Sequence, residues 1–216
     1  PNTTDARQKR YRFGNQGKVA IWNLVRLANA LYPLINEAEP IEKMLDIEVA
    51  EYETKRYKML QSKLGLSTEK VDKKFIDDLL ELLHRSEMDM TLFFRALSGF
   101  NANILGKEFI DKIAEYSYVD DFKPFAESWE NCLLLYQSFL KSENRNDIER
   151  VCEMNLQNPK YVLRNYMAQL AIDDADKGNY GLIEELFTLL KMPYAEQPEN
   201  EKWFAKRPDW AKHKVG

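Results

Sequence analysis

The segment of residues 18–31 is apolar on nearly every side, and it constrains the fold more than any other part of the chain. Its polar residues Asn23, Arg26 and Asn29 recur at every third position, so a helix here carries one narrow polar stripe. Such a helix needs a partner on each face. Because it lies so close to the beginning of the chain, we expect part of its cover to come from a larger protein. We also expect Asn23 and Arg26 to find polar partners there.

The composition is that of a soluble globular protein. The chain has 216 residues, of which 44% are hydrophobic and 31% charged, enough for one large domain. The net charge of -4 disfavours a nucleic-acid partner, and no apolar run approaches the roughly 18 residues that cross a membrane. No signal peptide is evident. The spacing of Cys132 and Cys152 fits no metal or redox motif, so we expect free thiols in a reduced, cytoplasmic protein.

Helical periodicity fills the space between few breaker residues, since glycine and proline occur only 8 times each. We therefore predict an all-α fold with no sheet of three or more strands. Thr68 and Asp89 are predicted N-caps, and Gly65 and Gly178 are predicted to end helices. Beyond the first helix, helices are predicted over residues 41–64, 71–83, 89–97, 107–116, 124–141, 145–156, 161–176 and 181–191.

Two of these segments carry apolar residues at helical spacing, which predicts their buried faces. The first face consists of Ile41, Met44, Leu45, Tyr52, Met59 and Leu60. The second consists of Val71, Phe75, Leu79 and Leu83.

The chain divides into three parts by composition. We expect an extended segment over residues 1–16, a helical domain over 17–191 and a tail over 192–216. Three prolines break the tail, yet it holds the aromatic residues Trp203, Phe204 and Trp210. Because a disordered tail would seldom carry so many aromatics, we expect this one to pack across the helices.

Few residues point to chemistry. His84 has no second ligand at helical spacing, and His213 lies in a basic tail, so neither predicts a metal site. The adjacent aspartate pairs point about 100° apart on a helix and are typical of caps and solvated faces. The basic residues around Arg10 either form a solvated face or steer an anion. Asn15 and Gln16 either cap the first helix or reach a ligand.

Two motifs carry a family likeness. The first is Tyr11-Arg12-Phe13-Gly14-Asn15-Gln16, followed by Trp22-Asn23-Leu24 and Arg26-Leu27-Ala28. The second is Asn158-Pro159-Lys160-Tyr161-Val162-Leu163-Arg164-Asn165-Tyr166, followed by Ala168-Gln169 and later by Pro193-Tyr194. In this order they resemble the selenoprotein O (YdiU) family.

The resemblance implies a protein-kinase-like fold and an enzyme that transfers AMP from ATP to protein hydroxyls with a divalent metal such as magnesium. The family's nucleotide, metal and catalytic residues lie upstream of Tyr11. We therefore expect this chain to be the C-terminal helical lobe of such an enzyme, without catalytic, cofactor or metal residues of its own. Its partners would be the upstream catalytic part and protein substrates. The candidate residues near the parent's active site are Tyr11, Arg12, Asn15, Gln16, Asn23 and Arg26.

The chain departs from the family pattern at two places. Gly17 stands where the family usually has proline, and Pro1 stands where it often has a cysteine, which weakens the case for a redox switch. The alternative from another class is a free-standing helical protein-interaction module without chemistry.

Overall fold

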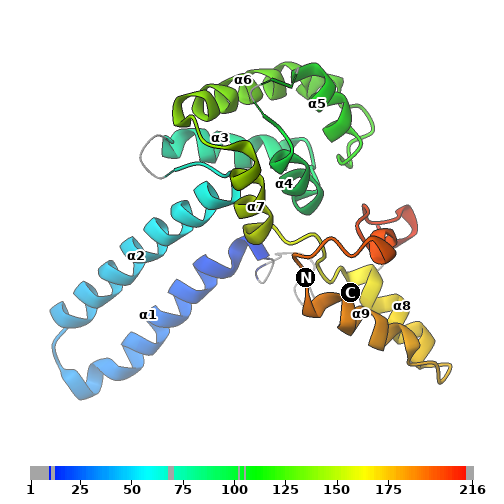
Figure 1. Cartoon of the computed structure of the whole chain (residues 1–216). Helices are drawn as coiled ribbons and strands as arrows, with labels where there is room; N and C mark the ends of the chain where they lie inside the picture. The colour runs from blue at the N-terminus through cyan, green and yellow to red at the C-terminus, as the bar shows by residue number, and fades with distance from the viewer. Residues whose placement is uncertain (1–9, 11–12, 68–70, 102, 105, 213–216) are drawn as a thin grey trace. The chain divides into compact units, whose positions relative to one another are not determined.

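The computed structural model describes residues 10, 13–67, 71–101, 103–104 and 106–212. Apart from one isolated antiparallel bridge between Met88 and Ser117, this part of the chain is helical or irregular, which confirms the all-α prediction (Figure 1). The α-helices are α1 (Gln16–Ile35), α2 (Glu39–Lys63), α3 (Lys73–Arg85), α4 (Met90–Ser98), α5 (Gly106–Ala114), α6 (Ala126–Glu143), α7 (Asp147–Gln157), α8 (Asn165–Ala175) and α9 (Gly181–Lys191). The 3-10 turns are η2 (Phe13–Asn15), η3 (Lys123–Phe125), η4 (Pro198–Trp203) and η5 (Asp209–Ala211). None of the helices in these ranges is both long and apolar enough to cross a membrane.

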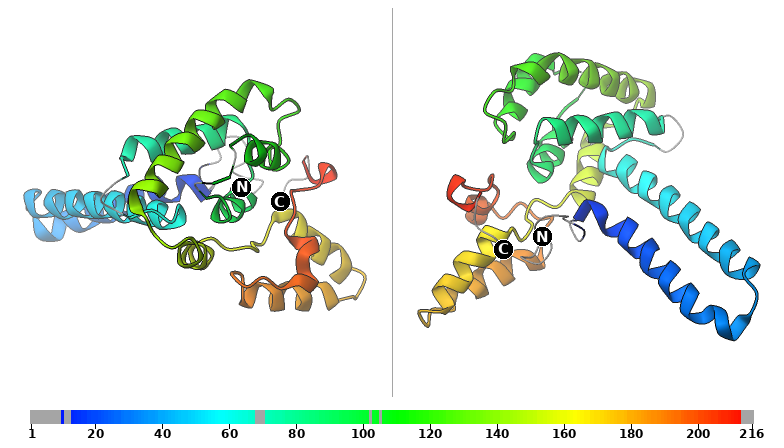
Figure 2. Two further views of the ribbon diagram at one scale, coloured as in Figure 1. Left: turned by 45° about the horizontal axis from the view of Figure 1, so that its top comes forward. Right: turned by 180° about the vertical axis from the view of Figure 1, so that it is seen from behind.

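The chain forms two compact units, one of residues 1–57 with 210–216 and the other of residues 58–209. In the first unit, α1 and the greater part of α2 run side by side in opposite directions, as Figure 1 and the right view of Figure 2 show. Asn36 ends α1 in the left-handed conformation, with φ 57°, and its N–H donates to the carbonyl of Tyr32. The predicted three-part division stays a prediction.

A close approach joins the two helices of this hairpin. A Cβ atom added at Gly17 of α1 would lie 1.9 Å from the hydroxyl oxygen of Tyr52 on α2. Such a distance is far inside van der Waals contact, so the ring of Tyr52 occupies the space that any side chain at position 17 would need. Gly17 is thus the residue that lets the two helices meet at this point.

The hairpin leaves both of its helices more exposed than their sequences predict. No residue of α1 is buried, although its apolar sequence predicts a buried helix. On α2 the predicted buried positions Met44, Tyr52 and Met59 are exposed, and of the predicted face only Leu60 is buried. The predictions for these three residues were wrong. In a two-helix hairpin each helix has one internal face, so apolar residues at its flanks remain in contact with solvent.

The second unit has a conventional core. The predicted face of Val71, Phe75, Leu79 and Leu83 is buried throughout, as expected from its four-residue spacing. At the centre Trp129 of α6 is fully buried, with its ring centre 5.1 Å from that of Phe93 on α4. Such aromatic pairs contribute about 0.5–1.5 kcal/mol beyond the burial of their area.

Helix ends in this unit follow the sequence signals in most places. Asp89 caps α4 by accepting a hydrogen bond from the N–H of Leu92 at 3.2 Å, as predicted. Gly65 and Gly178 adopt left-handed φ values of 64° and 81°, which confirms them as helix terminators. The predicted cap Thr68 lies outside the described residues, and the side chain of Asp72 caps α3.

The predicted helix over residues 161–176 begins only at Asn165. Residues 159–164 form an irregular connector, because the N–H groups of Lys160 and Tyr161 donate to the carbonyl of Pro193, at 2.8 and 3.1 Å. These bonds to a distant segment replace the bonds that a first helical turn would make. The second sequence motif is thus mainly a connector and not a helix.

Cys132 and Cys152 are both free thiols, and they differ in their surroundings. Burial raises the pKa of the Cys132 thiol to about 12, and Cys152 is exposed. At pH 8 only about one Cys132 in 10,000 would carry the reactive thiolate.

We therefore expect a thiol reagent to modify one cysteine quickly in the native protein and two after denaturation without reductant. Peptide mass spectrometry should identify the fast thiol as Cys152. A denatured count of zero would instead indicate a disulfide.

Candidate functional site

The candidate residues of the first motif lie around the start of α1. Tyr11 and Arg12 fall outside the described residues. Asn15 occupies the N-cap position, but its side chain makes no capping hydrogen bond, so the expected capping role is absent. Gln16 is the first residue of α1 and is exposed. Asn23 and Arg26 are also exposed along the helix, so the described structure presents them at its surface.

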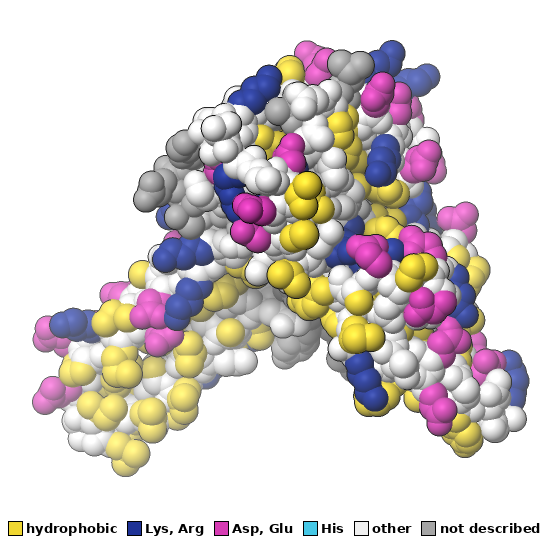
Figure 3. Space-filling model, viewed as in Figure 1, with side chains coloured by type: hydrophobic (Ala, Val, Ile, Leu, Met, Phe, Trp, Pro, Cys, Tyr) yellow, Lys and Arg dark blue, Asp and Glu magenta, His cyan; other side chains and the backbone are white. Residues whose placement is uncertain are grey.

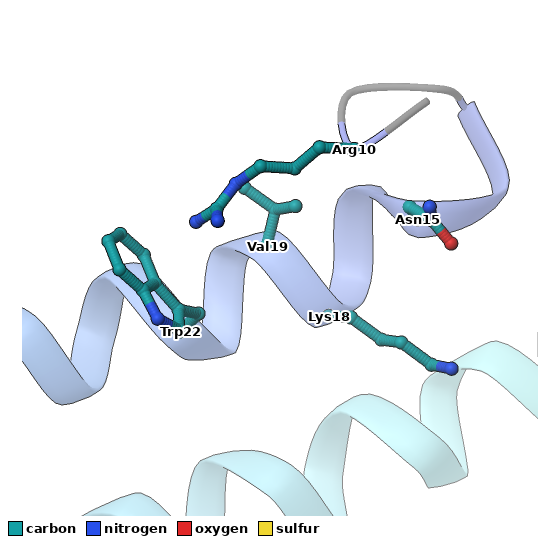
Figure 4. Close-up of a pocket in the computed structure, with 5 residues that line it drawn as sticks. All are labelled: Arg10, Asn15, Lys18, Val19 and Trp22. Carbon is teal, nitrogen blue, oxygen red and sulfur yellow. The ribbon is translucent and has the colours of Figure 1, made fainter. Parts of the chain in front are cut away.

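A shallow hollow of about 360 Å³ lies beside this end of the helix. Figure 4 shows its lining residues, which are Arg10, Asn15, Lys18, Val19 and Trp22. The guanidinium of Arg10 lies 4.3 Å from the centre of the Trp22 ring, and that of Arg26 lies 5.0 Å from it. The hollow thus includes Asn15 of the predicted residues, and Arg26 reaches the indole, whereas Gln16 and Asn23 do not line it.

The described lining of this hollow offers groups suited to binding. Among the described residues it contains cations, an amide and an indole, and none of these lining side chains is a carboxylate, thiol or imidazole that could act as a base or nucleophile. Within the described ranges no group of three or more His, Cys, Asp or Glu side chains could hold a metal ion. Magnesium prefers carboxylate oxygens, which none of the described lining residues supplies.

The second motif has a different and better-defined setting. Asn158 is buried, and its amide donates to the carbonyl of Lys63 at 2.8 Å while its oxygen accepts from the Lys63 ammonium at 2.9 Å. Arg95 of α4 donates to the Asn158 carbonyl at 3.0 Å. The motif is therefore tied to two helices of the second unit by its own backbone and side chains.

Two buried cations connect this motif to the tail. Arg95 and Lys160 have side chains that are only 6% and 8% exposed, and both pair with Glu196, the second at 3.0 Å. Lys160 also pairs with Glu201 at 2.6 Å. The hydroxyl of Tyr161 donates to the Glu196 carbonyl at 2.7 Å. We call these residues, Arg95, Lys160, Tyr161, Glu196 and Glu201, the tail clamp.

A buried ion pair lies beyond the tail clamp. Arg164 donates through both terminal nitrogens to the carboxylate of Asp89, which is 4% exposed, with one of these bonds at 3.0 Å. Tyr118 donates to the same carboxylate at 2.9 Å and accepts from the N–H of Arg207 at 2.8 Å. The pair thus joins the start of α4, the motif and the end of the tail.

Sequence reasoning missed Arg95 and Glu196. A signal for Arg95 was present, because it is the one charged residue in the apolar run of α4, where a cation requires a partner. No comparable signal existed for Glu196, which lies 101 residues further along the chain.

Acid should loosen the tail clamp. Burial opposes ionisation of Glu196, but the hydrogen bond from Lys160 and the charge of Arg95 outweigh it and hold the pKa of Glu196 below its usual value. A carboxyl whose pKa is lower in the folded state stabilises that state above its unfolded pKa of about 4.3, and the stabilisation is lost as pH falls through the folded value.

We therefore expect hydrogen exchange of residues 193–204 to lose protection below about pH 4.3, after correction for the intrinsic pH dependence. The loss should be about two- to fivefold, because Glu196 is well exposed and such pairs contribute little. The variant Glu196→Gln should show the weaker protection already at neutral pH. A wild-type tail whose protection does not change with pH would contradict this account.

Comparison with known proteins identifies the family of the chain. It is 51% identical to the protein nucleotidyltransferase YdiU of Flavobacterium johnsoniae, 43% to that of Aromatoleum aromaticum and 41% to that of Rhodopirellula baltica. Each match covers 100% of this chain but only 41–43% of the relative. A family model described as protein adenylyltransferase SelO matches residues 1–191. The chain belongs to the SelO protein adenylyltransferase family.

Proposed function

We propose that this chain is the C-terminal helical part of a protein adenylyltransferase. The observation that carries the proposal is family membership, since the family model matches residues 1–191 and the relatives match the whole chain. The reaction would join a serine, threonine or tyrosine hydroxyl oxygen of a protein to the α-phosphorus of ATP and release pyrophosphate. The chain covers about two fifths of its relatives, which supports a parent protein with further parts.

The role of the chain in that parent is support. Its all-helical fold agrees with the C-terminal lobe of a protein-kinase-like enzyme, as the resemblance implies. ATP and magnesium would bind to residues of the parent outside this chain, as the family resemblance implies. The partners would be the upstream catalytic part and protein substrates, and the free thiols support a cytoplasmic location.

The test is a transfer assay on the complete gene product and, in parallel, on the 216-residue chain. We expect the complete product to label protein from ATP carrying the label on the α-phosphate, but not from ATP labelled on the γ-phosphate. The chain alone should do neither. Failure of the complete product to transfer AMP would favour the alternative, a helical protein-interaction module. Transfer by the chain alone would show that catalytic residues lie within it.

The first-motif residues give a finer test. We expect Asn15→Ala or Arg26→Ala to lower the transfer rate of the complete product about tenfold, because polar partners left unsatisfied in an active conformation cost about 1–3 kcal/mol. Lys55→Ala is the matched control, since Lys55 pairs with Glu51 on an exposed face of α2. Equal rates in all three variants, at equal folded fraction, would indicate that Asn15 and Arg26 contribute to helix packing and not to activity.

A further inference from the structure

The face of α1 that points away from α2 is exposed and mostly apolar, with Asn23 as a polar residue on it. Leu27 and Leu34 are 55% and 80% exposed, and they lie seven residues apart on the same side of the helix. Val25, two residues before Leu27, is half-buried. A step of two residues turns an α-helix by about 200°, so Leu27 points away from the half-buried face. Figure 3 shows many hydrophobic side chains at the surface of the hairpin. We call the face around Leu27 and Leu34 the outer face of α1.

The outer side of α2 has a different character. The positions turned away from its half-buried residues Leu45 and Val49 include Lys43 and Thr54, both of which are exposed. These polar side chains are suited to water, but Ile47 lies on the same side and is 49% exposed. Leu34 of α1, at 80%, is more exposed than Ile47 and Met44 of α2, so the outer face of α1 has the greater need of cover.

The charges of α1 indicate the chemical character of a surface that could pack against it. Residues 16–35 contain two cations, Lys18 and Arg26, and no acidic residue. Arg26 lies beside the indole of Trp22, which is itself 45% exposed. Lys18 lies nine residues before Leu27, about 180° around the helix, so only Arg26 lies beside the outer face. A complementary surface would be apolar, with a carboxylate placed for Arg26.

We propose that the outer face of α1 is a docking surface for the part of the parent polypeptide that lies outside this chain, and that this part presents apolar residues with a carboxylate beside them. The inference rests on the proposed function. More than half the length of the relatives lies outside the region matched to this chain. A segment of the same polypeptide docks at high effective concentration and so needs little affinity of its own.

A second copy of the chain is a poorer occupant. A two-fold symmetric contact centred on Leu27 would bring the neighbouring Arg26 of each copy together. Like charges facing each other across an interface oppose association. The charge distribution thus favours a different, acidic partner over self-association.

The experiment compares thiol labelling at two engineered positions, Leu27→Cys on the outer face and Thr54→Cys on the polar side of α2 as the matched control. Each is made in the 216-residue chain and in the complete gene product, and labelling is measured per peptide by mass spectrometry. We expect both cysteines to react at similar rates in the chain. In the complete product Leu27→Cys should slow at least about tenfold, as buried groups do, while Thr54→Cys keeps its rate.

Three outcomes would overturn the proposal. The first is that Leu27→Cys reacts as fast in the complete product as in the 216-residue chain. The second is that it is already protected in the 216-residue chain. The third is that the complete product forms a dimer, and that the protection is lost when dilution dissociates this dimer. AMP transfer with a reactive Leu27→Cys would refute this inference alone. A protected Leu27→Cys without AMP transfer would refute the proposed function alone.

Discussion

Replacement of Arg150 by alanine should lower the free energy of unfolding of the second unit by about 3–5 kcal/mol. The residue is 2% exposed, and its guanidinium donates to the carbonyl of Phe100 at 2.7 Å and to that of Ser98 at 3.4 Å. It also reaches the hydroxyl of Tyr136 at 3.5 Å. Alanine would leave buried acceptors without donors and a cavity where the side chain lies.

Urea unfolding followed by near-ultraviolet circular dichroism measures this effect as a lower midpoint at an unchanged slope. Arg145→Ala is the matched control, because Arg145 pairs with Glu153 at 2.6 Å on the surface and should contribute less than about 1 kcal/mol. If the two variants lost equal stability, the contacts of Arg150 would not be what holds α7 to the end of α4.

Replacement of Arg164 by alanine should cost a similar amount, about 3–5 kcal/mol, because it leaves the buried carboxylate of Asp89 without its cation. Among the described residues, the hydroxyl of Tyr118 and the N–H of Leu92 would still bind that carboxylate. The same urea titration measures the loss.

A second substitution separates charge from packing. Adding Asp89→Asn to Arg164→Ala removes the unpaired charge and keeps an oxygen that can cap α4, so we expect it to recover part of the lost stability. Simple addition of the two single losses would show that the two residues do not interact.

The sequence predicted those parts of the fold that depend on near neighbours. The four-residue spacing from Val71 to Leu83 gave a buried face, and Asp89 and Gly178 marked helix ends, because both signals act within one turn. Tyr161 was placed in a helix, because the competing bond of its N–H runs to Pro193, over thirty residues away. No local pattern reports such a bond.

The candidate site was predictable only in part. The sequence singled out Asn15 and Arg26, and the structure places them at or beside one hollow through Trp22. The exposure of α1 could not be deduced, since an apolar helix predicts that cover exists and does not identify it. The role of Arg95 depends on Glu196, and the contact forms only when the tail folds back on α4.

The contact between Gly17 and Tyr52 has a consequence for exchanging parts among relatives. The ring of Tyr52 lies where any side chain at position 17 would have to be, and the resembling family usually has proline at that position. A chimera that takes the start of α1 from a proline-bearing relative and keeps α2 from this chain would require the ring of Tyr52, which is 42% exposed, to leave its position. Residues 17 and 52 should therefore be exchanged together in any such chimera.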